Sequence, residues 1–105
     1  MRQFIIAAAA VVIVSPSEAD NIVTIRYDHM GCREPAHYHQ LARLMEARDE
    51  AAAAAFAESK GVDCIFLAKG AVVDLRDFSL LRGLACVRTR GKPWCYWTAF
   101  DVVQK

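Results

Sequence analysis

Four cysteines are the residues of this chain whose type and spacing most directly indicate chemistry: Cys32, Cys64, Cys86 and Cys95. Cysteine thiols bind metals, carry out redox exchange or form disulfides. Neither a Cys-x-x-Cys pair nor a zinc spacing occurs, and an even number of cysteines in a short exported chain is typical of a disulfide framework. We therefore predict two structural disulfides, with a reducible thiol pair at Cys86 and Cys95 as the alternative.

The first nineteen residues indicate export. Arg2 supplies a positive charge, Phe4 to Val14 form an apolar run, and Ser17-x-Ala19 is a small-residue cleavage site, which are the three parts of a secretory signal peptide. The apolar run is shorter than the roughly 20 helical residues that cross a bilayer. The mature chain would begin at Asp20 and be small enough that hydrophobic burial alone gives marginal stability.

The spacing of the last two cysteines predicts how all four pair. If Arg90-Gly91 is a two-residue hairpin loop, Cys86 lies opposite Cys95 in a pair without backbone hydrogen bonds, at about 4.5 Å between Cα atoms. The same register puts Pro93 where its missing N–H is not needed. A longer loop is the alternative, because Arg-Gly is a less typical turn pair than Asn-Gly. Cys32 then pairs with Cys64 and brackets the helical segment.

Aromatic and basic residues gather near the C-terminus and form the candidate binding surface. Aromatic rings can stack on a peptide or glycan, and cations can bind an acidic partner, although packing of the rings and protection of a strand edge by the charges are the simpler interpretations. The formal net charge of the whole chain is only +1, so any charge argument is local. The candidate ligand-binding residues are Trp94, Tyr96, Trp97, Arg88, Arg90 and Lys92.

Metal binding and catalysis are weakly indicated. His29, His37 and His39 lie near Asp28 and Glu34, but residues 37 and 39 point about 200° apart on a helix, so surface histidines are the simpler interpretation. No serine or free cysteine stands in a catalytic motif, and no phosphate-binding glycine loop occurs. We therefore expect no enzyme activity, no cofactor and no metal site.

The periodicity of apolar residues predicts helices followed by strands. Pro35 suits the first position of a helix and Asp49 suits an N-cap, so two helices with a break near Arg48 are favoured over one long helix that stops at Gly61. Residues 20–105 are expected to form one domain, with an arm and helices in 20–61 and a β-barrel in 62–105. The expected elements are a strand or arm at 22–27, a turn at 28–32, helical structure at 35–59, strands at 64–67, 71–75, 84–89 and 94–98, and a helical turn at 99–103.

The stretch from Cys64 to Val103 resembles bacterial SH3-like domains. The resemblance lies in Lys69-Gly70 before a valine-rich strand, the Val87-Arg88 strand, a glycine hairpin and the strand Tyr96-Trp97-Thr98. Tyr96 departs from the pattern, because the family has a small residue there. The helical stretch is similar to that of small exported proteobacterial proteins with a similar Tyr-Trp-Thr strand. The resemblance implies a small antiparallel barrel of a kind that commonly binds ligands, but a fold alone does not assign a function.

The sequence as a whole predicts an α+β protein in which one or two helices pack on a small, antiparallel, SH3-like β-barrel stapled by disulfides. The expected function is that of a periplasmic or secreted binding module for an envelope protein, a peptide or a cell-wall polymer. Nucleic acid is not an expected partner in that compartment. The alternatives are a periplasmic inhibitor or accessory factor that inserts the loop of residues 90–94 into a cleft, and a metal-handling protein that uses the histidines.

Overall fold

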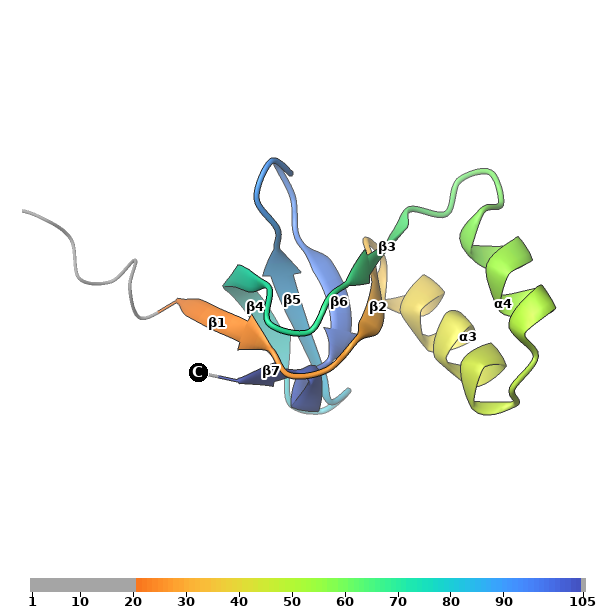
Figure 1. Ribbon diagram of the computed structural model, residues 1–105, viewed down its shortest axis with the longest axis horizontal. Coiled ribbons are helices and arrows are strands. Elements are labelled where there is room, and N and C mark those ends of the chain that lie inside the picture. Colours follow the sequence, from red (N-terminus) through yellow and green to blue (C-terminus); the bar gives the residue numbers. More distant parts are fainter. Residues whose placement is uncertain (1–20, 105) are drawn as a thin grey trace, which may run out of the picture.

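The computed structural model describes residues 21–104, so the predicted signal peptide lies outside the described residues. Two helices stand together at one end of the molecule, next to β2 and β3 and away from β1 and β7 (Figure 1). Within residues 21–104, no helix is long and apolar enough to span a membrane. The elements are β1 (Ile22–Ile25), β2 (His29–Cys32), α3 (Pro35–Glu46), α4 (Glu50–Ala57), β3 (Cys64–Leu67), β4 (Val72–Ser79), β5 (Leu84–Arg88), β6 (Tyr96–Ala99), the 3-10 helix η1 (Phe100–Val102) and β7 (Val103–Gln104).

The prediction of two helices with a break near Arg48 is confirmed. Pro35 occupies the start of α3, where its missing N–H is not needed by the helix. Arg48 has a positive φ of 59°, which stops the first helix. The Asp49 side chain then accepts a hydrogen bond from the Ala52 N–H at 3.1 Å and caps α4. The second helix ends at Ala57, before the expected stop at Gly61.

The strands form one antiparallel sheet in the order β3-β2-β6-β5-β4-β1-β7. Strands β1 and β2 precede the helices in sequence and β3 to β7 follow them, and all seven join the sheet. The sheet therefore includes residues outside the range 62–105 that was expected to form the β-barrel. The predicted turn at 28–32 is wrong, because His29–Cys32 form strand β2, which pairs with β3 over four residues. Strand β4 continues to Ser79, four residues past its predicted end. The α+β class is therefore confirmed, but the two ends of the strand order do not pair among the described residues, and the sheet is not closed into a barrel.

The predicted hairpin register between β5 and β6 is also wrong. Cys86 lies opposite Trp97 and Val87 opposite Tyr96, so the pairing is displaced by two residues from the expected one. The two-residue loop at Arg90-Gly91 is replaced by a longer connection, residues 89–95, in which the Lys92 N–H donates to the Thr89 carbonyl at 3.1 Å. Pro93 lies in this connection rather than in a strand. The displacement by two residues keeps Cys95 on the same side as Cys86.

Two apolar clusters lie on opposite faces of the sheet. The first is enclosed by the curved sheet and consists of residues from β1, β3, β4, β5 and η1: Val23, Ile25, Leu67, Val73, Val87 and Val102. The second lies between the sheet and the helices and contains Cys32, Tyr38, Leu41 and Leu84, with Trp97 and Phe56 packed against it. Because the helices cover only the half of the outer face formed around β2 and β6, the outer face of β1 and β4 stays open.

Candidate functional site

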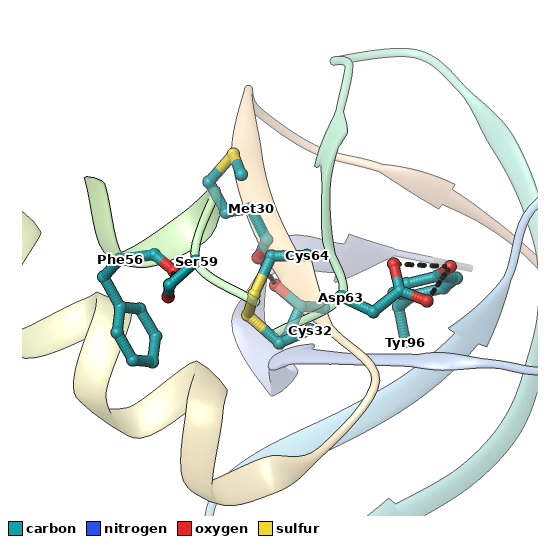
Figure 2. The surroundings of a disulfide bond; sticks show 8 residues. Met30, Cys32, Phe56, Ser59, Asp63, Cys64 and Tyr96 are labelled. Carbon is teal, nitrogen blue, oxygen red and sulfur yellow. Dashed lines mark hydrogen bonds between the residues drawn. A yellow bond between two sulfur atoms is a disulfide. The ribbon is translucent and has the colours of Figure 1, made fainter. Parts of the chain in front are cut away.

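The predicted aromatic residues lie where the helical insertion meets the sheet. Tyr96 is fully buried, and its hydroxyl donates to the Asp63 carboxylate, with distances of 3.1 and 3.0 Å to the two oxygens (Figure 2). The Trp94 indole N–H in turn donates to the Tyr96 hydroxyl oxygen at 3.0 Å. This chain of hydrogen bonds joins the β5–β6 connection to the residue that precedes β3. The Tyr96 ring therefore has no surface to offer to a ligand.

Arg33 adds a second attachment at the same place. Its guanidinium carbon lies 3.7 Å from the centroid of the Trp94 ring, and its backbone N–H donates to the Asp63 carbonyl at 2.8 Å. Trp97 is half-buried in the cluster between helices and sheet. Of the three predicted aromatic ligand residues, Trp94 alone keeps substantial exposure, at 38%, and Arg33 covers one face of its ring. These aromatic side chains therefore fasten the helical insertion to the sheet.

Both predicted disulfides are confirmed. Cys32 and Cys64 lie directly opposite each other in the β2–β3 pair, with 3.9 Å between their Cα atoms, and close the base of the helical insertion. Figure 2 shows this bond between the helices and the Asp63–Tyr96 contact. Cys86 and Cys95 are joined with 5.3 Å between Cα atoms, as diagonal rather than directly opposed residues. No free cysteine occurs in the described part of the chain.

The predicted basic residues lie on the open half of the sheet. The Arg88 guanidinium donates to the Asp74 carboxylate at 2.8 Å, and both side chains are partly exposed. The Arg88 Nε is buried and has no hydrogen-bond partner among residues 21–104. Arg90 and Lys92 are exposed in the β5–β6 connection. Asp74 thus fixes one end of the guanidinium, and because Nε is buried, only the terminal N–H groups of the partly exposed side chain can reach an anion.

These cations border three hollows that share residues and form one groove, which we call the cationic groove. Two hollows of about 340 and 230 Å³ share Ile22, Asp74 and Arg88. The third, of about 450 Å³, joins the first through Val72, Val73, Thr89 and Arg90. The charged residues that line the cationic groove are Arg76, Arg88, Arg90, Lys92 and Asp74.

The floor of the cationic groove is apolar, and the sequence did not predict its residues as part of a binding surface. Ile22, Phe66 and Val72 are large apolar residues with exposed fractions of 41%, 60% and 58%. Ile22 and Val72 face outward because their neighbours Val23 and Val73 point into the enclosed core, and side chains alternate along a strand. The alternation Val72-x-Asp74-x-Arg76 indicates that these three side chains share one face of the strand. It identifies a groove only once Ile22 and Arg88 are known to lie opposite Asp74 on the neighbouring strands.

The histidines do not gather into a metal site. His29 lies on β2 with its Nε2 at 2.8 Å from the Tyr38 hydroxyl, and the ring of His37 packs edge-on against Phe56. Burial lowers the pKa of His29 below its usual value, against the opposing effect of the Asp101 carboxylate. Burial also raises the pKa of the Tyr38 hydroxyl. Within residues 21–104, no group of three or more histidine, cysteine or acidic side chains is placed to hold a metal ion.

Comparisons of the chain with protein-family models, with curated proteins and with solved structures found no match. The functional interpretation therefore rests on the geometry of the site.

Proposed function

We propose that this protein is an exported binding module whose cationic groove binds an acidic ligand. The observation that carries the proposal is the charge of the groove: four cations line it, and its single acid, Asp74, is already paired with Arg88. The predicted signal peptide and the two disulfides support export. An envelope protein, a peptide or a carboxylate-bearing wall polymer would supply the acidic groups.

The composition of the cationic groove fits an extended ligand with both acidic and apolar groups. Arginine guanidinium groups form paired hydrogen bonds with carboxylates, and Asp74 holds Arg88 in place for such a contact. Burial of the exposed parts of Ile22, Phe66 and Val72 would add a hydrophobic contribution. Charge would increase the rate of encounter and the apolar floor would retain the ligand.

The strand pairing supports an SH3-like architecture for this module. Strand β1 pairs with β4 and β7, β4 pairs with β5, and β5 pairs with β6, which together make a five-stranded antiparallel unit. Strands β2 and β3 add a two-stranded extension that carries the helices. In this proposal the helical insertion is fixed to an SH3-like core, and the opening between β3 and the rest of that core forms part of the cationic groove.

A charge-reversal experiment tests the binding function. We expect poly-L-glutamate to bind the mature protein at low salt, and the double variant Arg90→Glu, Lys92→Glu to weaken that binding about tenfold or more. The matched control is Arg43→Glu, Lys60→Glu, which changes the net charge equally at exposed positions outside the groove. Fluorescence anisotropy measures both. Equal weakening by the two variants, or no binding by folded wild-type protein, would contradict the proposal.

A second candidate function is favoured by a different surface. Leu80 and Leu81, at the tip between β4 and β5, have exposed fractions of 73% and 101%, and Phe78 below them is 52% exposed. A protruding apolar tip suits insertion into a cleft of another protein, as an inhibitor or accessory factor requires. The sequence placed such insertion at residues 90–94, but Cys95 and Trp94 tie that connection down. The variant Leu80→Ser, Leu81→Ser should abolish partner capture only if this second function holds.

A further inference from the structure

Strand β3 is an edge strand that carries no charged residue and no proline. It stands at one end of the strand order, with β2 on one side and the 450 Å³ part of the cationic groove on the other. Exposed edges normally carry charged residues or proline, or are very short. The four residues of β3, Cys-Ile-Phe-Leu, contain neither. The opposite edge, β7, has only two residues.

The hydrogen-bond parity of β3 shows which backbone groups face the groove. Because the Arg33 N–H donates to the Asp63 carbonyl at 2.8 Å, residues 33 and 63 form a hydrogen-bonded pair of the antiparallel ladder. The same register makes 31/65 and 29/67 the next hydrogen-bonded pairs. The N–H and C=O of Phe66 therefore point away from β2. Among the described residues, no strand or turn pairs with them.

We propose that the ligand of the cationic groove is a polypeptide that adds to β3 as an extended strand. This inference rests on the proposed function and names its ligand class. The Phe66 N–H and C=O would form backbone hydrogen bonds with the peptide, while acidic side chains of the peptide reach Arg90 and Lys92 on the facing wall of the groove. A wall polysaccharide carries carboxylates but has no peptide N–H and C=O groups repeating at strand spacing.

Strand addition also predicts the pattern of the ligand. Successive side chains of an added strand point to opposite faces, at about 3.3 Å per residue. One face of the peptide would meet the cations and the other the exposed apolar floor near Phe66. We therefore expect a segment in which acidic and apolar residues alternate.

Two substitutions at one position isolate the backbone contribution. The probe is a capped hexapeptide of alternating glutamate and valine. Phe66→Ala removes the aromatic ring but keeps the N–H, whereas Phe66→Pro removes both, and proline is tolerated where the N–H of an edge strand faces outward. We expect Phe66→Pro to bind the hexapeptide about tenfold more weakly than Phe66→Ala, as the loss of a backbone hydrogen bond implies. Equal binding by the two folded variants would overturn strand addition.

A second measurement decides the question even if Phe66→Pro does not fold. The hexapeptide is N-methylated either at its glutamates or at its valines and tested on the wild-type protein. Only one of the two alternating sets of N–H groups faces β3, so we expect one methylated peptide to lose binding at least tenfold and the other to keep it. Equal effects of the two methylations would overturn strand addition.

The same assays separate this inference from the function on which it rests. If poly-L-glutamate binding depends on Arg90 and Lys92 but the methylated hexapeptides bind equally, the groove binds anions and the strand inference is wrong. If a carboxylated polysaccharide, polygalacturonate, binds more tightly than the hexapeptide and is insensitive to Phe66→Pro, the ligand is a polymer of another class. If sedimentation shows a dimer that Phe66→Pro dissociates, a second copy occupies the edge. If neither acidic probe binds, the proposed function fails as well.

Discussion

Two regions of the molecule use similar residues differently: the covered half, at the base of the helical insertion, and the open half, around the cationic groove. On the half covered by the helices, the cation Arg33 lies against Trp94 and the acid Asp63 accepts from the buried Tyr96 hydroxyl. On the open half, the pair Arg88–Asp74 is partly exposed and Arg90 and Lys92 are exposed, with the Lys92 ammonium 5.9 Å from the centroid of the Tyr96 ring. Strand β3 belongs to both regions, because Cys64 joins it to β2 at the base of the insertion and its free edge borders the cationic groove. We therefore expect the covered half to contribute mainly to stability, and the open half to be the place where the proposed binding occurs.

This difference shows why aromatic residues in a small disulfide-bonded protein are a weak guide to a ligand-binding surface. A helical insertion of this length must be attached at its base, and buried aromatic residues with hydrogen bonds to partners do that efficiently. The ligand surface then depends on residues that the insertion leaves uncovered. Changes on the covered half should alter stability, while changes on the open half should alter binding.

The largest expected effect comes from removing the disulfide at the base of the insertion. Cys32→Ser, Cys64→Ser opens a loop with a sequence separation of 32 residues. The chain-entropy relation gives a loss of about 3.5–4 kcal/mol in the free energy of unfolding. Urea unfolding measures this loss, and hydrogen exchange should show it first in α3 and α4. A small domain can lose most of its stability in this way.

Cys86→Ser, Cys95→Ser provides the comparison. Its separation is 9 residues, for which the same relation gives about 2.5–3 kcal/mol. The variant should therefore retain more stability than the first. A larger loss from this shorter loop would show that the attachment of the β5–β6 connection, and not that of the helices, dominates the stability of the protein.

Local sequence signals predicted the parts of this fold that depend on neighbouring residues. The capping residue Asp49 and the break at Arg48 were read correctly, because a helix boundary depends on the residues that form it. The cysteine pairing was also correct. The predicted pairing holds although the predicted hairpin register is wrong, because shifting the strand pairing by two residues keeps Cys86 and Cys95 on the same face.

Features that depend on distant partners were not predictable in the same way. Strand β2 was missed because His-Met-Gly-Cys has the composition of a turn, and it becomes a strand only by pairing with β3, more than thirty residues later. Glycine suits position 31 because a Cβ there would make a tight contact, 3.3 Å, with the Trp97 carbonyl oxygen. The buried Tyr96 hydroxyl donates to Asp63, which lies 33 residues earlier in the sequence, just after the helical insertion. The cationic groove combines three separate segments of the chain for the same reason.

An intermediate effect is expected from Tyr96→Phe on the covered half. The change removes the hydroxyl that donates to Asp63 and accepts from Trp94, and it leaves both partners without that contact. We expect a loss of about 1–3 kcal/mol in the free energy of unfolding, with unchanged binding of poly-L-glutamate. Chemical denaturation and anisotropy measure the two quantities on one sample. A variant that keeps its stability but loses binding would reverse the assignment of the two halves.

The smallest expected effect is a pH dependence of stability that originates at His29 on the covered side. Burial lowers the pKa of His29 in the folded protein, so the folded state favours the neutral ring. Its contribution to stability is complete above the unfolded pKa of about 6.5 and is lost as the pH falls from there through the lower folded-state value. Thermal unfolding at about pH 7.5 and about pH 5.5 should show a decrease in Tm that is smaller in His29→Gln, which does not titrate. His37 and His39 are retained in both proteins, so the difference reports His29 alone; an equal decrease in the two proteins would show that the His29–Tyr38 contact does not link proton binding to folding.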